Sequence, residues 1–130
     1  MTEKLIKKKK ILILDDEKDV TDFIQILLSL EDFEVKTLNN SMELMDEIEK
    51  NDYDLLLIDI MMPQLNGWQL VRLIKNDRKY KKIPIIIITA LNDRRNSFFA
   101  KHCGVDGFFV KPFSPEQLIL RIREILSEKD

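Results

Sequence analysis

Two short apolar runs in the sequence end in acidic residues. Residues 11–14 (Ile-Leu-Ile-Leu) lead into Asp-Asp-Glu at 15–17, and residues 55–58 lead into Asp59. Because an unpaired charge is costly inside an apolar strand, we expect these acids at the mouths of two strands. Neighbouring strands would crowd the acids into one pocket, where they repel each other unless a cation joins them. The pattern therefore predicts a hard metal ion and chemistry built around that ion.

The acids differ in the chemistry that they offer. Asp59 begins a loop in which Pro63 stiffens the chain and Gly67 lets the backbone turn into a helix, so its carboxylate is accessible. An accessible aspartate is a nucleophile toward phosphoryl groups. Asp15 and Asp16 offer the oxygen ligands that Mg²⁺ prefers. Taken alone, Asp59 is explained as a loop residue and Asp16 as a helix cap, but three consecutive acids exceed the need of a cap.

Two further strand ends carry residues suited to phosphate chemistry. Thr89 follows the apolar residues 85–88, and its hydroxyl can donate to a phosphoryl oxygen. Lys111 follows the apolar residues 108–110; it can pair with carboxylates at rest and bind a phosphoryl group on arrival. Separately, Thr89 is explained as a β-branched strand residue and Lys111 as a surface charge. The joint pattern favours the functional interpretation.

The elements that must position these residues follow from the apolar pattern. Apolar runs without a period of two are typical of parallel strands that are buried on both faces. Such runs predict strands at residues 11–14, 55–58, 85–88 and 108–110, and a more polar edge strand at 34–38.

Apolar residues at helical spacing fill the intervals between these strands. The predicted stripes are Val20, Phe23, Ile24, Leu27 and Leu30; Met42, Met45 and Ile48; Leu70, Leu73 and Ile74; Phe98 and Phe99; and Leu118, Ile122, Ile125 and Leu126. The fourth helix is expected to stop before Gly104. The last helix has a clear start, with Ser114 as its cap, Pro115 at its first position and Gln117 completing a capping box.

Strand and helix alternate five times, which predicts an α/β fold with a parallel sheet and right-handed crossovers. We expect a flavodoxin-like, doubly wound (βα)5 domain with strand order 2-1-3-4-5, an order taken from known folds of this kind. In that order the first and third strands flank the reversal of winding, where ligands bind. Asp15, Asp16 and Asp59 would then converge.

Composition sets the outer limits of the function. The chain has 130 residues and a net charge of −2, which predicts one domain over residues 1–130, with a basic lead-in at 1–9 and a globular core at 10–127. The charge balance argues against direct nucleic-acid binding, and the basic lead-in is interpreted as solvated rather than as a membrane or nucleic-acid arm. Cys103 is the only cysteine, which excludes an internal disulfide and favours a cytoplasmic location. No apolar stretch is long enough to cross a bilayer.

From Lys10 to Leu126, the chain resembles a known family, the receiver domains of two-component response regulators. The motifs that carry the resemblance are the segments 11–17 (Ile-Leu-Ile-Leu-Asp-Asp-Glu), 59–67 (Asp-Ile-Met-Met-Pro-Gln-Leu-Asn-Gly), 89–90 (Thr-Ala) and 111–113 (Lys-Pro-Phe). The resemblance implies a signalling domain that catalyses only its own phosphorylation and dephosphorylation. Its phosphate donor would be a sensor histidine kinase or a histidine phosphotransfer protein.

The resemblance also implies roles for individual residues. Asp59 would accept the phosphoryl group, and Thr89 and Lys111 would contact it. Asp15 or Asp16, or both, would hold Mg²⁺, and the protein ligands would be completed by Asp59 and the backbone carbonyl of Met61. The bond between Lys111 and Pro112 resembles one that is usually cis in the family.

A switch is implied as well. Phosphorylation would draw Thr89 toward the acyl phosphate, and Phe108, where many members have tyrosine, would fill the vacated space. The surface of the fourth helix, fifth strand and fifth helix would then change, to control a partner or output domain or a homodimer formed through this surface. Met61 and Leu91 are apolar at positions that influence water attack in the family, so slow self-dephosphorylation is expected.

Three other classes of protein share parts of this pattern. A flavin-binding module would need a first loop that cradles phosphate, and the acidic loop at 15–17 would repel it. A haloacid-dehalogenase-like phosphatase needs a second acid two residues after its nucleophile, where Met61 stands. A degenerate receiver that acts as a phosphorylation-independent binding scaffold is disfavoured because every expected site residue is present. His102, the only histidine, is interpreted as a surface residue rather than as a ligand or phosphodonor.

Overall fold

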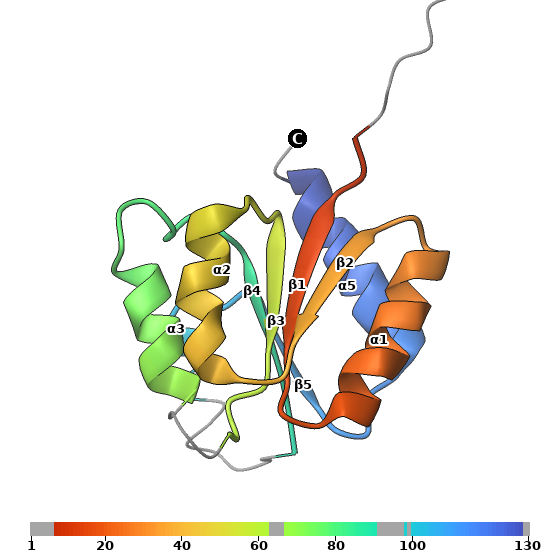
Figure 1. The fold of residues 1–130 in the computed structure, drawn as a ribbon. Helices are drawn as coiled ribbons and strands as arrows, with labels where there is room; N and C mark the ends of the chain where they lie inside the picture. The colour runs from red at the N-terminus through yellow and green to blue at the C-terminus, as the bar shows by residue number, and fades with distance from the viewer. Residues whose placement is uncertain (1–6, 63–66, 91–97, 99, 129–130) are drawn as a thin grey trace, which may run out of the picture.

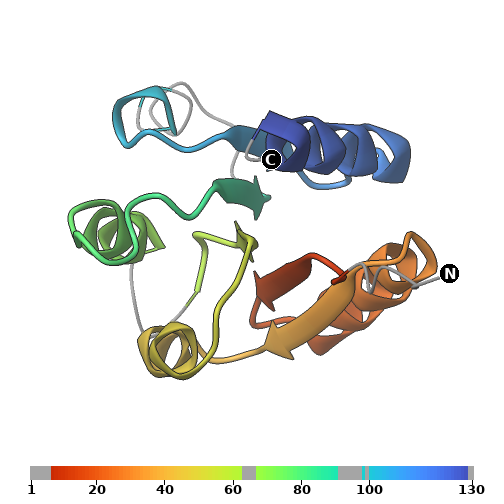
Figure 2. The same cartoon turned by 90° about the horizontal axis from the view of Figure 1, so that it is seen from above.

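A computed structural model describes residues 7–62, 67–90, 98 and 100–128. Five parallel strands form one sheet in the order β2-β1-β3-β4-β5, with helices on both faces (Figures 1 and 2). The strands are β1 (Lys10–Leu14), β2 (Glu34–Leu38), β3 (Leu55–Ile58), β4 (Ile85–Thr89) and β5 (Gly107–Val110). The helices are α1 (Lys18–Leu30), the 3₁₀ turn η1 (Ser41–Glu43), α2 (Leu44–Lys50), α3 (Gly67–Lys75) and α5 (Pro115–Glu128). The predicted fold and strand order are confirmed.

The core has two layers, one on each face of the sheet. Seen from above, α2 and α3 cover one face and α1 and α5 cover the other (Figure 2). Alternate strand residues serve the two layers, as Leu12 and Leu56 do on the α2 and α3 side and Ile13 and Leu57 on the α1 and α5 side. Every residue of β3 and β4 is buried. Burial on both faces is the reason that these runs lack the period of two.

The predicted apolar stripe of α1 is wrong in part. The helix buries Thr21, Ile24 and Leu28, whereas Phe23 is 51% exposed and Leu30 is 79% exposed. Apolar residues lie on nearly every side of this helix, so spacing alone did not select the side that packs. Packing selects the side of α1 that carries Leu28. That side completes the core layer that the sheet and α5 also form.

Similar shifts occur in the next two helices, since Met42 and Leu73 are exposed while Leu44 and Val71 are buried. The strand positions and the α5 stripe are confirmed. All four predicted α5 residues are buried: Leu118, Ile122, Ile125 and Leu126.

The start of α5 and the end of the predicted fourth helix also match expectation where the structure describes them. The Ser114 Oγ accepts a hydrogen bond from the backbone N–H of Gln117 at 3.3 Å, as the predicted cap requires. Phe98 and residues 100–102 are helical, and Gly104 follows with a φ of 75°. Such a positive φ favours glycine at a helix end. Phe99 lies outside the described residues.

Among the described residues, no helix has both the length and the apolar character needed to cross a membrane.

Candidate functional site

The carboxyl ends of β1 and β3 place two aspartates side by side. The strands pair in parallel, and Leu14 lies opposite Ile58. The Asp59 N–H donates to the carbonyl of Leu14 at 2.9 Å, and the Asp15 N–H donates to the carbonyl of Leu38 in β2 at 3.1 Å. The sheet's own hydrogen bonding therefore continues into the site and fixes both aspartate backbones.

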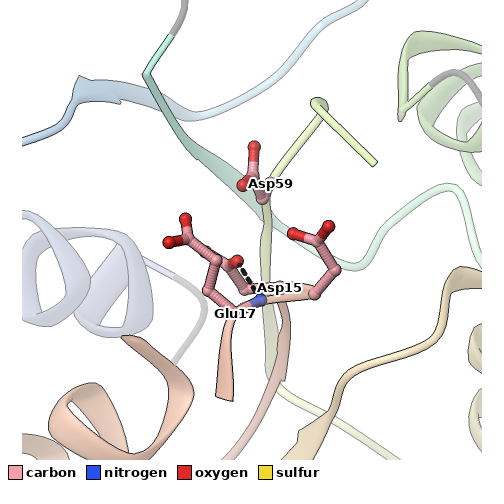
Figure 3. Close-up of side chains that lie close together, drawn as sticks. Asp15, Glu17 and Asp59 are labelled. Carbon is pink, nitrogen blue, oxygen red and sulfur yellow. Dashed lines mark hydrogen bonds between the residues drawn. The ribbon is translucent and has the colours of Figure 1, made fainter. Parts of the chain in front are cut away.

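Each aspartate uses one oxygen to hold its own loop. Oδ1 of Asp15 accepts from the N–H of Glu17 at 2.9 Å, and Oδ1 of Asp59 accepts from the N–H of Met61 at 2.9 Å. Asp15 is 2% exposed and Asp59 is 4% exposed. Figure 3 shows the carboxylates of Asp15, Glu17 and Asp59 gathered at this edge of the sheet, with the Asp15–Glu17 bond dashed. The second oxygen of each aspartate remains for another partner.

That partner is Lys111, which follows β5. Its Nζ lies 2.7 Å from Oδ2 of Asp15, 3.1 Å from Oδ2 of Asp59 and 3.3 Å from Oε1 of Glu17. Its backbone N–H donates to the carbonyl of Thr89 at 2.8 Å, which ties the end of β5 to the end of β4. One ammonium group thus bridges the acids of two different strand ends.

Burial and charge act in opposite directions on these groups. Burial raises the pKa of Asp15 above its usual value of 3.8; the hydrogen bond from Lys111 opposes this rise, and the charge of Asp59 adds to it. Burial alone would lower the pKa of Lys111, but its hydrogen bond to Asp15 and the charges of Asp15 and Asp59 raise it well above the usual value. Lys111 therefore stays cationic, while Asp15 bears an uncompensated cost of burial.

The acids also have the geometry of a cation site. One carboxylate oxygen from each of Asp15, Asp16, Glu17 and Asp59 lies within 4.8 Å of the others. Four carboxylates against the one ammonium of Lys111 leave a formal charge of −3 (four negative, one positive). A set of oxygen donors with excess negative charge fits a hard divalent ion such as Mg²⁺.

The remaining predicted residues surround this cluster. Thr89 ends β4 and is 0% exposed. Phe108 in β5 is half-buried and packs against the layer on the α2 and α3 side. The Met61 side chain is exposed, and the bond between Lys111 and Pro112 is cis, as predicted. Leu91 and the loop residues 63–66 lie outside the described residues.

Gly67 acts through its size rather than through backbone freedom. A Cβ on Gly67 would lie 2.1 Å from Cα of Ile60, closer than any real contact. The Gly67 N–H donates to the Ile60 carbonyl at 3.1 Å. The backbones of Gly67 and Ile60 are therefore in direct contact, and only a residue without a side chain fits at position 67.

Two residues near the site have no role in the sequence-based prediction. Glu17 belongs to the predicted acidic run, but its contact with Lys111 spans 94 residues of sequence and leaves no local pattern. Asn39 lies outside the predicted site; its Nδ2 donates to the backbone carbonyl of Asp15 at 2.8 Å. The available signal was the position of Asn39 directly after a predicted strand that neighbours the first.

Comparisons with known proteins agree on one family. The family model described as "Response regulator receiver domain" matches residues 11–123. The response regulator SaeR of Staphylococcus aureus is 37% identical over 117 residues, which cover 90% of this chain and 50% of SaeR. The chain thus spans about half the length of the curated relatives that it matches.

Solved structures give the same result. A CheY-like response regulator receiver domain protein from Methanospirillum hungatei has a TM-score of 0.87 at 30% identity, covering 94% of this chain and 96% of that one. Chemotaxis protein CheY4 of Vibrio cholerae has a TM-score of 0.84 at 26% identity, covering 92% of this chain and 99% of its own. The matches of sequence and of fold lead to one conclusion: this chain belongs to the response regulator receiver domain family.

Proposed function

We propose that this domain accepts a phosphoryl group on Asp59, in a Mg²⁺-dependent reaction, from a histidine kinase or a histidine phosphotransfer protein. The observation that carries the proposal is the bridge from Lys111 to Asp15 and Asp59 inside a cluster of four carboxylates. Asp59 is nucleophile and acceptor, since it directly follows β3 and its Oδ1 already accepts a hydrogen bond from the N–H of Met61.

This geometry supports the proposed transfer. The Asp59 carboxylate attacks phosphorus as the P–N bond of the donor's phosphohistidine breaks, and the imidazole leaves with the electron pair. Lys111 then exchanges its carboxylate partners for phosphoryl oxygens and neutralises charge in the transition state. Asp15, Asp16, Asp59 and the carbonyl of Met61 would hold Mg²⁺. The bound ion supplies further neutralisation of the phosphoryl oxygens.

The consequence of transfer is a switch in packing. We propose that Thr89 turns toward the acyl phosphate and that Phe108 moves into the space it leaves. Support comes from the buried position of Thr89 at the end of β4 and from β5, whose residues are all half-buried and so have an accessible side. The surface of the fourth helix, β5 and α5 would pass the signal to an output domain or partner, or to a second copy of the domain.

The proposal covers one receiver domain with its core at residues 10–127. Because the chain spans about half the length of its curated relatives, the output activity that the switch controls is part of the proposal.

Acetyl phosphate or phosphoramidate with Mg²⁺ tests the proposal. Intact-mass measurement is expected to show the gain of one phosphoryl group, lost in Asp59→Asn. Asp54→Asn is the matched control. Asp54 precedes β3, at the end of the strand opposite to Asp59, and its carboxylate accepts a hydrogen bond from the backbone N–H of Lys10. A phosphoryl gain that survives Asp59→Asn would refute the assignment. Absence of any gain in the wild type would favour a phosphorylation-independent scaffold.

A further inference from the structure

The amide side chain of Asn39 reaches from the end of β2 to the loop that carries the first two acids. Its Nδ2 donates to the backbone carbonyl of Asp15 at 2.8 Å and to Oγ1 of Thr21 at 3.0 Å. Both acceptors belong to buried residues, 2% exposed for Asp15 and 0% for Thr21. Asn39 thus satisfies two groups that water reaches poorly.

Thr21 extends this connection into the first turn of α1. Its hydroxyl donates to the carbonyl of Lys18 at 3.0 Å while accepting from Asn39. The Asn39 side chain is therefore oriented by a helix that does not itself carry a predicted ligand. The ends of β1 and β2 and the start of α1 are joined through one amide.

The bond from Asn39 controls a particular peptide group. The carbonyl of Asp15 belongs to the peptide that links Asp15 to Asp16, and the N–H of Asp15 is already held by Leu38. The N–H of Glu17 is held in turn by Oδ1 of Asp15, so the 15–16 peptide is restrained on both sides of its carbonyl. Asp16 is exposed, and rotation of this peptide would move its carboxylate.

We propose that Asn39 is a positioning residue for the metal site: it holds the 15–16 peptide so that the carboxylates of Asp15 and Asp16 face the same ion. The inference rests on the proposed function, because it concerns the Mg²⁺ that the phosphotransfer requires. Groups that orient metal ligands typically change affinity by about ten-fold or more when removed. A residue that only satisfied a buried carbonyl would change stability and leave Mg²⁺ affinity intact.

Three single variants separate these roles. Asn39→Ala removes both bonds, and Thr21→Val removes the group that orients the amide. Asn40→Ala is the matched control, because its Oδ1 accepts from the N–H of Met42 at 2.9 Å on the same loop, away from the acids. Mg²⁺ affinity is read from the rise of the thermal midpoint with MgCl₂ at constant ionic strength. Phosphorylation by phosphoramidate is followed across the same Mg²⁺ range.

Asn39→Ala is expected to weaken Mg²⁺ binding about ten-fold. Its phosphorylation rate at saturating Mg²⁺ should stay within about two-fold of wild type, because the reacting groups are unchanged. Thr21→Val should weaken binding less, and the double variant should add little to Asn39→Ala, since both act through one amide. Asn40→Ala should bind Mg²⁺ as the wild type does.

Unchanged Mg²⁺ affinity in Asn39→Ala, with only a lower midpoint in metal-free buffer, would overturn the inference. Should Asn39→Ala not fold, the Mg²⁺ affinity of Thr21→Val takes its place, and an unchanged affinity overturns the inference. An equal loss of affinity in Asn40→Ala would also overturn it, since the effect would then be general to the loop. A wild-type protein that binds no Mg²⁺ would refute the proposed function together with the inference, whereas a normal wild type with a normal Asn39→Ala refutes the inference alone.

Discussion

Asp15 shows how burial prepares a residue for a cation. Its carboxylate is almost fully buried, and burial raises its pKa more than Lys111 lowers it. In the folded protein Asp15 therefore binds a proton more readily than in the unfolded chain. The free energy of unfolding is accordingly reduced as the pH rises through the folded pKa, and ionised Asp15 is a cost at neutral pH.

We therefore expect Asp15→Asn to raise the urea midpoint of the metal-free protein at pH 7. Lys111 keeps Asp59 and Glu17 as partners in this variant. The gain in urea midpoint over the wild type should shrink as the pH falls toward the usual aspartate pKa of 3.8, because the wild-type carboxyl then becomes protonated and uncharged. Asp46→Asn, an exposed aspartate paired with Lys50, is the control and should change stability by less than about 0.5 kcal/mol. A lower midpoint for Asp15→Asn at pH 7 would show that the Lys111 pairing outweighs the cost of burial.

The lifetime of the phosphorylated state is a second property set by single residues. Met61, two residues after Asp59, is exposed, and its side chain gives water no strong hydrogen-bonding partner. Leu91 is also apolar. We expect slow loss of phosphate and a faster loss in Leu91→Glu, since a carboxylate can orient water. Following the phosphorylated mass over time checks this, and an equal rate in both proteins would contradict it.

Among the elements, α3 is sensitive to a change at its first residue. Gly67 opens α3 against the backbone of Ile60, so a methyl group there must displace main chain. We expect Gly67→Ala to lose about 1–3 kcal/mol of stability and to slow phosphorylation, because the segment after Asp59 shifts.

Gly104→Ala provides the comparison for this element. Its φ of 75° makes alanine unfavourable by about 1–2 kcal/mol, but no atom lies within 4 Å of the added Cβ. Chemical denaturation and phosphoramidate labelling of both variants should give similar losses of stability, with slower labelling in Gly67→Ala alone. Equal labelling rates would show that the segment adapts without moving the acceptor.

At the scale of the molecule, the two edges of the sheet are expected to respond unequally to phosphorylation. The proposed switch residues lie in β4 and β5, at one side of the sheet, whereas β2 lies at the other edge. Adding beryllofluoride, a phosphoryl mimic, with Mg²⁺ should alter amide hydrogen exchange in β5 and α5 and leave β2 and α2 unchanged. Asp59→Asn should abolish the response. A change confined to β2, or none in β5, would exclude the proposed route.

Much of the architecture could be predicted from the sequence, for a physical reason. Strands buried on both faces must be apolar throughout, so the runs before Asp15, Asp59 and Thr89 mark their own boundaries. An acid or hydroxyl at the end of such a run must lie where the carboxyl ends of the strands meet. Parallel pairing then brings these strand ends together, which is why the sequence predicts the candidate site.

The tertiary structure alone decided what depends on distant packing. Helix α1 has apolar residues on several sides, and packing against the sheet and α5 selects Leu28 over Leu30 for the core. The bond from Asn39 to Asp15 joins residues 24 apart, and the bridge from Lys111 to Asp15 joins residues 96 apart. Local patterns encode burial and strand ends, whereas the choice among distant partners is made by the packed chain.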